Sequence, residues 1–350
     1  MEGTMKALVM ERYLDFELKD WEIPQITDSQ VLVKVRAVSI CGSDIGGSNG
    51  KSGRRIPPII MGHEASGDIV EVGKAVRGWH AGQRVTFDST EYCGECSFCR
   101  KGQINLCENR KVLGVSCDEY RRHGAMAEYV AVESRTLYAL PDSVSYEEAA
   151  LVEPLSIGVH AVAISPIQMG DVVLINGCGT IGLMTLQAVK ASGASRIIMS
   201  DLDDSRLDIA ASMGATDLIN SDSVDVPEQV YKLTGGRGAD LAFDAVGLEV
   251  TVRNAIYSLR KGGCVVAIGN IGQEIRFPLQ YCITRQIRMQ GSCASSGEYD
   301  ICLSMIASGK IDVSPFLQNL MPLEQGKAAF ERFYNREPNL LKVVLTAGKD

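Results

Sequence analysis

The distribution of apolar and polar positions changes near residue 154. Before it, short segments such as 31–38 and 67–72 alternate in part between apolar and polar residues, as half-buried strands do. Dense turn signals separate these segments, among them Gly46-Gly47 and Pro57-Pro58. Short strands with frequent glycine predict a small β-barrel or sandwich in this part of the chain.

Beyond residue 154, continuous apolar runs alternate with stretches of helical periodicity. The run 171–175 predicts a strand buried on both faces, and apolar residues then recur at helical spacing from Ile181 to Val189. The alternation continues with strands expected at 196–200, 218–219, 241–244, 264–268 and 287–289, and helices at 205–213, 227–233 and 250–259. Repeated β–α alternation predicts an α/β fold with a doubly wound parallel sheet.

The C-terminal tail is too short for a domain of its own. It contains an expected helix at 298–308, a helical segment at 330–333 and a strand at 340–345. We expect the tail to pack back on the first domain. The chain would then divide into residues 1–154 with 293–350, and an inserted second domain at 155–292.

Composition and charge narrow the class of protein. The 350 residues are 45% hydrophobic, which is ordinary for a globular protein, and the net charge of −8 argues against a nucleic-acid partner or an anionic membrane. No apolar run reaches the roughly 18 residues of a membrane span, and the charged segment 1–19 lacks the apolar core of a signal peptide. We therefore expect a cytoplasmic protein, in which the 11 cysteines stay reduced.

A glycine-rich turn directly follows the first strand of the second domain. It reads Gly177-Cys178-Gly179-Thr180-Ile181-Gly182 and opens the next helix. The bare motif is a weak signal, but in this context backbone N–H groups and the helix dipole can meet a pyrophosphate. The turn predicts a dinucleotide site.

Asp201 ends the second strand of the same βαβ unit. A carboxylate at this place can accept hydrogen bonds from both hydroxyls of an adenosine ribose and would repel a 2′-phosphate. It therefore favours NAD over NADP. The alternative is that Asp201 only caps the following helix.

Four cysteines lie within one short segment. Cys93, Cys96, Cys99 and Cys107 have the spacing C-x2-C-x2-C-x7-C, which suits a closed tetrahedral zinc site that braces a loop. An iron–sulfur cluster is the chemical alternative, and reduced thiols without a metal are the other.

A second group of metal-ligand types is dispersed along the chain. It comprises Cys41 in Cys-Gly-Ser-Asp, His63-Glu64 after a glycine, and Glu153 before a proline. Each residue alone is a weak signal. One thiolate, one imidazole and carboxylates together make a mixed site that can leave a position open for water or substrate.

These segments, in order over nearly the whole chain, resemble the zinc-dependent medium-chain alcohol dehydrogenase family. Glu153 stands where alcohol-dehydrogenase branches carry a third cysteine ligand, and the segment 152–161 is similar to the polyol (sorbitol-type) branch. The resemblance implies a GroES-like β-barrel catalytic domain and a Rossmann-type coenzyme domain. It also implies one catalytic and one structural zinc per chain, and a homodimer or homotetramer.

The resemblance further assigns roles to single residues. Cys41 and His63 would hold the catalytic zinc, with Glu64 and Glu153 as direct or water-bridged ligands. Asp44 would orient His63, and Ser43 would accept the proton of the alcohol. Contacts with the coenzyme would come from Arg206 near the adenosine ribose and from Ile268, Gly269 and Asn270 near the nicotinamide.

The expected function is hydride transfer between NAD and a polyol or sugar-like secondary alcohol, in which zinc lowers the pKa of the alcohol. Many relatives carry His or an aromatic residue where this chain has Ile45-Gly46-Gly47, which we expect to leave room for a longer substrate. The cationic loop 51–55 suggests a phosphorylated polyol or a sugar acid as the alternative substrate. A catalytically silent dinucleotide-binding protein on the same fold is the alternative from another class. The zinc-free quinone or enoyl reductase branch is disfavoured by Cys41, His63 and the four-cysteine loop.

Overall fold

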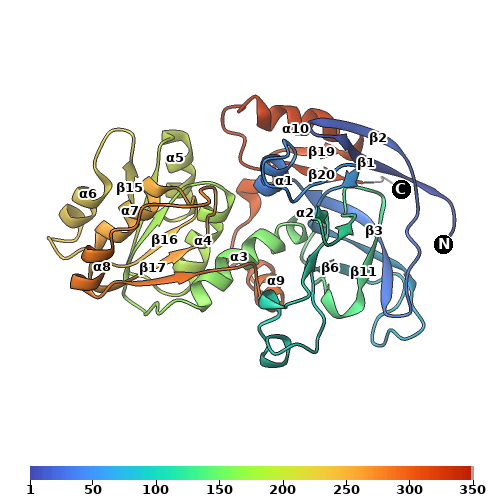
Figure 1. Ribbon diagram of the computed structural model, residues 1–350, viewed down its shortest axis with the longest axis horizontal. Helices are drawn as coiled ribbons and strands as arrows, with labels where there is room; N and C mark the ends of the chain where they lie inside the picture. Colours follow the sequence, from blue (N-terminus) through green and yellow to red (C-terminus); the bar gives the residue numbers. More distant parts are fainter. Residues whose placement is uncertain (348–350) are drawn as a thin grey trace. The chain divides into compact units, whose positions relative to one another are not determined.

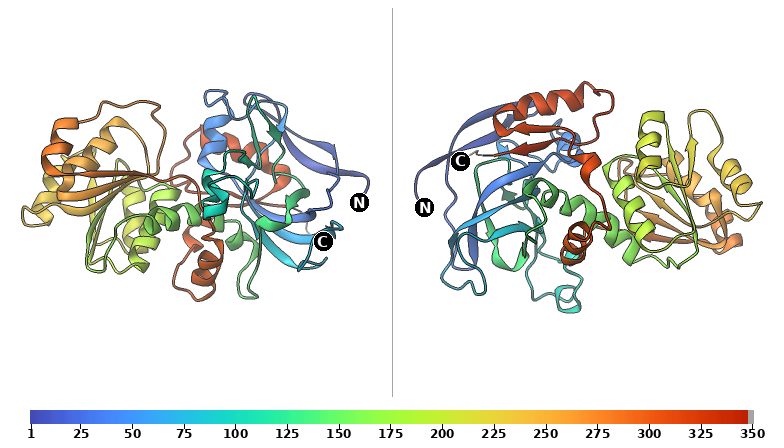
Figure 2. Two further views of the ribbon diagram at one scale, coloured as in Figure 1. Left: turned by 60° about the horizontal axis from the view of Figure 1, so that its bottom comes forward. Right: turned by 180° about the vertical axis from the view of Figure 1, so that it is seen from behind.

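The structure is a computed structural model that describes residues 1–347. The chain divides into two compact units (Figures 1 and 2). Met1–Glu153, Tyr299–Ser308 and the described part of Val313–Asp350 form the first unit, and Pro154–Glu298 with Gly309–Asp312 form the second. The return to the first unit thus comes at Tyr299, later than the residue 293 expected from the sequence. Among the described residues, no helix is long and apolar enough to cross a membrane.

The first unit is built mainly from antiparallel strands. Its larger sheet has the order β12-β6-β5-β3-β20-β19 with β11 also paired to β3, and a smaller sheet has the order β2-β1-β4. The strands of these two sheets are β1 (Thr4–Arg12), β2 (Asp15–Glu22), β3 (Gln30–Ser39), β4 (Ile59–Ile60), β5 (Glu64–Val72), β6 (Arg84–Phe87), β11 (Tyr129–Glu133), β12 (Leu137–Ala139), β19 (Leu320–Pro322) and β20 (Val344–Thr346). Their inward-facing residues form one apolar core.

Short helices and two-stranded ribbons complete the first unit. The helices are α1 (Gly42–Gly47), α2 (Tyr146–Ala149), α9 (Tyr299–Ala307) and α10 (Gly326–Tyr334). The ribbons pair β7 (Thr90–Glu91) with β8 (Lys111–Val112) and β9 (Val115–Ser116) with β10 (Arg121–Arg122). Single 3-10 turns lie at Cys99–Lys101, Ile104–Leu106, Ser134–Thr136, Ser314–Phe316 and Leu323–Gln325.

The C-terminal tail joins the N-terminal strands inside the first unit, as expected. Strand β20 pairs antiparallel with β3, and helix α10 lies beside β2, which Figures 1 and 2 show as red segments next to blue ones. The rings of Phe16 and Phe330 stack there with centroids 4.1 Å apart. The strand expected at 340–345 is shorter and later than predicted, because only 344–346 pair in the sheet.

The second unit is a parallel six-stranded sheet with the order β15-β14-β13-β16-β17-β18. Its strands are β13 (Val172–Asn176), β14 (Arg196–Asp201), β15 (Asp217–Asn220), β16 (Ala239–Asp244), β17 (Leu259–Ala267) and β18 (Arg288–Gly291). Its helices are α4 (Thr180–Ala191), α5 (Asp204–Met213), α6 (Val226–Leu233), α7 (Glu249–Ser258) and α8 (Leu279–Arg285), and α3 (Val152–Ala163) leads into the unit. This is the predicted doubly wound α/β architecture.

The strand order reverses between β13 and β16, because the chain crosses back over β13 after β15. In an open parallel sheet of this kind, ligands bind outside the carboxyl ends of the strands at such a reversal. Right-handed crossovers place α4 and α5 on one face, and α6 and α7, which contact each other, on the other. The fold therefore directs attention to the residues that follow β13, β14 and β17.

Candidate functional site

The glycine turn lies at the carboxyl end of β13 and opens α4. Gly177 has a φ of +96°, and a Cβ there would lie 2.6 Å from Cγ2 of Val246, so the turn requires glycine at this place. A Cβ on Gly182 would lie 1.7 Å from the carbonyl oxygen of Gly177. Only glycine, which has no Cβ, therefore lets the helix start so close to the strand.

Gly179, by contrast, has open space around it. It is the N-cap residue of α4, no side chain caps the helix, and an added Cβ would meet nothing within 4 Å. The N-terminus of this 12-residue helix therefore begins beside open space at Gly179, with no side chain placed over it. This arrangement fits a pyrophosphate, since the open N-terminus of the helix and the helix dipole favour an anion.

Asp201 is held against this turn. Its Oδ2 accepts a hydrogen bond from the backbone N–H of Cys178 at 2.6 Å, and its Oδ1 accepts one from the N–H of Asp203 at 3.1 Å. The N-cap residue of α5 is Asp203, whose carboxylate accepts from Ser205 N at 2.9 Å. The simple alternative for Asp201, a helix cap, is therefore excluded. Arg206, in the first turn of α5, lies 3.8 Å from the carboxylate of Asp203.

The segment 268–270 follows β17 and lies at the same edge of the sheet. The backbone N–H groups of Ile268 and Gly269 both donate to the carbonyl oxygen of Asp244 at 2.9 Å. A Cβ on Gly269 would lie 2.2 Å from the backbone of Val246, so this segment packs closely on the loop after β16. The structure thus brings the three predicted coenzyme segments, with Asn270 at the end of the last one, to one edge of the sheet.

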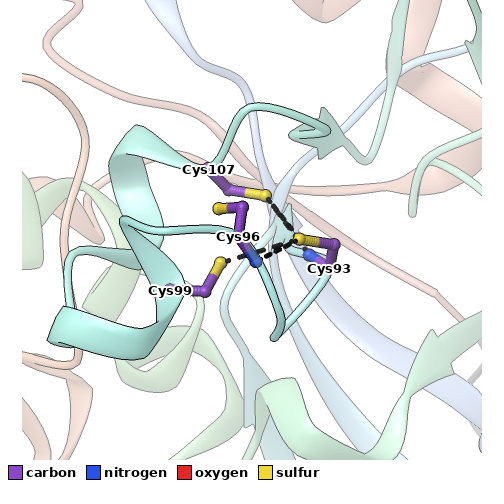
Figure 3. Close-up of side chains that lie close together, drawn as sticks. All are labelled: Cys93, Cys96, Cys99 and Cys107. Atoms are coloured by element: carbon purple, nitrogen blue, oxygen red, sulfur yellow. Dashed lines mark hydrogen bonds between the residues drawn. The ribbon is translucent and has the colours of Figure 1, made fainter.

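The four cysteines of the loop after β7 converge, as Figure 3 shows. Their sulfur atoms all lie within 4.8 Å of one another, with Cys93 Sγ 4.0 Å from Cys99 Sγ and 3.6 Å from Cys107 Sγ. A tetrahedral zinc with Zn–S bonds of about 2.3 Å requires sulfur separations of roughly 3.8 Å. Because each thiolate of a four-iron cluster binds a separate iron, such a cluster needs wider spacing than this group offers.

Backbone N–H groups also point at these sulfur atoms. Cys96 N donates to Cys93 Sγ at 3.4 Å, and Cys93 N donates to Cys107 Sγ at 3.2 Å. N–H groups, first that of Glu95 and then that of Cys96, lower the pKa of Cys93 to about 6. Burial, by contrast, raises the pKa of Cys99 to about 12. Cys93 can therefore ionise before metal arrives, whereas Cys99 needs the metal to displace its proton, and zinc binds both as thiolates.

A second cluster of metal-ligand atoms forms inside the first unit. Cys41, at the start of α1, and His63 with Glu64, at the start of β5, bring their ligand atoms within 4.8 Å of one another. Oε1 of Glu64 is buried and has no hydrogen-bond partner among the described residues 1–347. An unpartnered buried carboxylate oxygen beside a thiol and an imidazole is what a bound cation would complete, so the residues fit a zinc ion.

The thiol of Cys41 needs such a cation to ionise. Desolvation, followed by the charge of Glu64, raises the pKa of Cys41 to about 12. Without a metal the sulfur therefore keeps its proton at neutral pH. A divalent ion would displace that proton and bind the thiolate.

Ser43 and Asp44 flank the imidazole of His63 on different sides. Asp44 Oδ1 lies 3.5 Å from Nδ1, and Ser43 Oγ lies 3.5 Å from Nε2 and 3.2 Å from the sulfur of Cys41. Nδ1 makes no hydrogen bond at this distance. With Nδ1 facing the carboxylate, Nε2 is the nitrogen that faces the thiol and is placed to hold a metal.

Glu153, at the first turn of α3, is not part of the compact group of three. Its carboxyl is nevertheless close enough to interact with the group. Burial raises its pKa well above the ordinary value, the charge of His63 opposes this, and the charges of Glu64 and Cys41 add to it. Of the four predicted ligands, the structure therefore brings three together and places the fourth nearby.

Sequence reasoning missed two buried partners of Glu64. Lys342 Nζ and Ser39 Oγ both donate to Oε2, and all three side chains are buried. Desolvation lowers the pKa of Lys342, but the charge and hydrogen bond of Glu64 together with the charges of Cys41 and Glu153 outweigh it, so the pKa is raised and the ammonium persists. The sequence did contain one sign of the role of Lys342, since it is a single cationic residue within the apolar stretch 340–345. These two donors hold Oε2 and leave Oε1 for the metal.

Two family models and several known proteins are similar to this chain. Residues 27–142 match the family model described as an alcohol dehydrogenase GroES-like domain, and residues 180–308 match that of a zinc-binding dehydrogenase. The chain is 35% identical to a sorbitol dehydrogenase of Bacillus subtilis strain 168, over 98% of this chain and 97% of that protein.

The chain belongs to the zinc-binding dehydrogenase family. A D-arabitol-phosphate dehydrogenase of Enterococcus avium is also similar to this chain. The two are 34% identical over 100% of this chain and 99% of the Enterococcus avium protein. A solved Sinorhizobium meliloti 1021 protein, described as a zinc-binding dehydrogenase and bound to NADP, has a TM-score of 0.90 and 29% identity. The match covers 98% of this chain and 99% of the Sinorhizobium meliloti chain.

Family membership confirms the predicted GroES-like and Rossmann-type pair of domains and the polyol-dehydrogenase resemblance. This zinc-binding dehydrogenase is an enzyme of alcohol oxidoreduction, with zinc and a nicotinamide dinucleotide as its cofactors. A silent protein would have no need for the thiol, the imidazole and the unpartnered carboxylate oxygen that converge here.

Proposed function

We propose that this enzyme transfers hydride between NAD and a secondary alcohol of a polyol or a sugar-like compound. One observation carries the proposal. A single chain combines an open glycine turn braced by a carboxylate with a buried thiol–imidazole–carboxylate group of metal-ligand geometry. The 35% identity to a sorbitol dehydrogenase supports the polyol class.

In this proposal Cys41 Sγ, His63 Nε2 and Glu64 Oε1 hold the catalytic zinc, with Glu153 close by. When bound, the zinc polarises the alcohol oxygen as a Lewis acid, and the nicotinamide accepts the hydride. Asp44 fixes the ring orientation of His63.

Ser43 moves the proton. Its hydroxyl lies 3.2 Å from the sulfur of Cys41 and is exposed, so it can accept the proton of the alcohol while its own proton passes to water. The alcohol thereby becomes a carbonyl compound, NAD becomes NADH, and one proton leaves to solvent.

The coenzyme preference rests on Asp201. Its carboxylate at the edge of the glycine turn is placed to accept from ribose hydroxyls and to repel a 2′-phosphate. The Sinorhizobium meliloti structure binds NADP, so the choice in this chain depends on its own residues at this edge.

The test is a panel of polyols, sugar phosphates and simple secondary alcohols assayed with NAD by the appearance of NADH absorbance. The same preparation is analysed for metal, with about two zinc ions expected per chain. We expect polyol oxidation that disappears on zinc removal. The absence of zinc-dependent NAD reduction with every secondary alcohol would contradict the proposal.

A phosphorylated polyol or a sugar acid is the second candidate substrate, favoured by the D-arabitol-phosphate relative. The structure weakens the cationic-loop argument, because Arg55 is 4% exposed and pairs with Asp44. Lys51 and Arg54 remain exposed in that loop. If kcat/KM favours the phosphate of a polyol, and Arg54→Ala removes that preference, the second candidate replaces the first.

We also propose that the enzyme is a homo-oligomer in a reducing compartment such as the cytoplasm. All four residues of the edge strand β18 are exposed, and nearby Leu279 and Ile283 are 61% and 69% exposed. An exposed strand edge beside apolar side chains favours pairing with a second copy. All 11 cysteines are free thiols. Light scattering after size-exclusion chromatography tests self-association, and a monomer would contradict it.

A further inference from the structure

Arg55 lies in a loop that the sequence presents as cationic and solvated, yet its side chain is buried. Its Nε and Nη2 donate to Asp44 Oδ1 at 3.2 and 3.0 Å, and its Nη1 donates to the carbonyl oxygen of Arg54 at 3.0 Å. Asp44 itself has no exposed surface. A buried guanidinium on a buried carboxylate forms a fixed ion pair, because either charge alone would be costly.

The same guanidinium also reaches the proposed proton acceptor. Arg55 Nη2 donates to Ser43 Oγ at 3.2 Å. A hydroxyl has one hydrogen and two acceptor positions, whereas a guanidinium can only donate. Arg55 therefore occupies an acceptor position of Ser43, and the hydroxyl hydrogen must point elsewhere. The atoms within reach are Cys41 Sγ at 3.2 Å and His63 Nε2 at 3.5 Å. Because Nε2 has one lone pair, which the zinc would take, Cys41 Sγ is the acceptor that remains in the loaded enzyme.

Helix α1 is shaped to admit this side chain. A Cβ on Gly47 would lie 2.5 Å from Cγ of Arg55, in the stem of a buried side chain. Gly47 does not have a positive φ, so its backbone does not require glycine. The missing side chain makes room for Arg55. The expectation that Gly47 enlarges the substrate space is therefore wrong, because the room there is filled by Arg55, whereas a Cβ on Gly46 would meet nothing within 4 Å.

We propose that Arg55 is a positioning residue, which acts by orienting the hydroxyl of Ser43 toward the sulfur of Cys41. This inference rests on the proposed function. Arg55 cannot accept a proton, so it is not a relay member. It also gives a physical account of the segment Ile45-Gly46-Gly47, which lacks the His or aromatic residue of many relatives. Ser43 is exposed, so once it has accepted the proton of the alcohol, water can remove one of its two protons.

The first test moves Arg55 without changing its chemistry. Gly47→Ala displaces the Arg55 stem, while Gly46→Ala is the matched control, since a Cβ there meets nothing within 4 Å. Misplacement of a reacting group by about 1 Å costs on the order of a hundredfold in rate. We expect Gly47→Ala and Arg55→Lys to lower kcat about tenfold to a hundredfold with KM changed less than about threefold, and Gly46→Ala to lower kcat less than threefold.

The second test separates orientation of Ser43 from a merely structural role. Arg55→Lys is repeated in a Ser43→Ala background. If Arg55 acts through Ser43, the further loss in kcat falls below about threefold there. A loss as large as in the wild-type background would show that Arg55 acts otherwise and would overturn the inference.

A third readout does not depend on turnover. In the cobalt-substituted protein, the thiolate-to-metal charge-transfer band reports hydrogen bonds to Cys41 Sγ. We expect Gly47→Ala to shift this band relative to Gly46→Ala, and to cause no shift when Ser43 is alanine. The four-cysteine site contributes equally to both spectra and cancels in their difference. If the wild type oxidises no alcohol, the proposed function fails, and the charge-transfer band alone tests whether Arg55 orients Ser43. An unshifted band in Gly47→Ala would then refute the inference about Arg55.

Discussion

Replacing Asp201 by asparagine removes the charge that we expect to select the coenzyme, at almost unchanged size. The carboxylate accepts from Cys178 N and from Asp203 N, one bond per oxygen. Asparagine has one acceptor oxygen, so it keeps one of these bonds and presents an NH₂ group to the other donor. Serine would be too short for both and would also loosen the glycine turn, which makes asparagine the cleaner test of charge.

The expected effect follows from the lost charge. A carboxylate–hydroxyl bond is worth about 1.5–3 kcal/mol and a neutral bond about 0.5–1.5 kcal/mol, so NADH binding should weaken by about 1–2 kcal/mol, or five- to thirtyfold. The repulsion between a carboxylate and a unit charge of the 2′-phosphate 4 Å away is about 1 kcal/mol in water and about 4 kcal/mol near a protein surface. Relief of that repulsion should strengthen NADPH binding about tenfold or more. The preference for NADH over NADPH should therefore fall by about fiftyfold or more.

Fluorescence titration of the zinc-loaded enzyme with NADH and with NADPH measures this preference. The matched control is Asp208→Asn, which removes an exposed carboxylate from the same helix α5 but away from the glycine turn. We expect the control to leave the ratio of the two Kd values within about twofold, since exposed charges are screened. An unchanged ratio in Asp201→Asn, or an equal change in the control, would refute the reasoning. So would a wild type that binds both coenzymes equally.

The other predictions address metal and stability. Cys99→Ser should lower Tm by about 5 °C or more and remove about one zinc per chain, whereas Cys293→Ser, at an exposed thiol outside the four-cysteine group, should change neither in calorimetry and metal analysis. His63→Ala should abolish alcohol oxidation at a Tm within a few degrees of the wild type, and a drop as large as that of Cys99→Ser would contradict separate roles for the two metals. Burial opposes ionisation of Asp240, but hydrogen bonds from Arg237 and Arg260 lower its pKa to about 2. Ionised Asp240 therefore stabilises the folded protein by about 1–2 kcal/mol above pH ~4, and this stabilisation is lost as the pH falls toward ~2. Asp240→Asn should accordingly lower the urea-unfolding free energy at pH 7 but not near pH 2, and a constant difference would contradict this.

The parts of the molecule that local pattern predicts are those whose contacts are close in sequence. The buried strand β13, the glycine turn and helix α4 follow one another within 20 residues or so, and their hydrophobic period changes visibly from strand to helix. The four-cysteine group lies within one loop, so its spacing alone brings the sulfur atoms together. In both cases the kind of site could be predicted without knowing which distant residues the segment contacts.

The surroundings of the catalytic ligands were decided by tertiary structure. Lys342 reaches Glu64 across 278 residues of chain, because β20 pairs with β3 in the register that sets Val344 opposite Ser39. A period of two shows which residues of a strand face inward, but not which strand lies beside it. The pairing of Lys342 with Glu64 could therefore not be predicted, although a buried lysine could have been suspected.

Arg55 shows the same limit at short range. Its sequence neighbours are polar and cationic, so local pattern assigns it to solvent. The fold instead places Asp44 in a fully buried position with a vacant space beside Gly47, and the cost of an unpaired buried carboxylate brings the guanidinium inside. The sequence by itself thus determined which chemistry the chain can hold, through residue types and local spacing. Only the folded structure decided which charges meet, because burial makes their pairing obligatory.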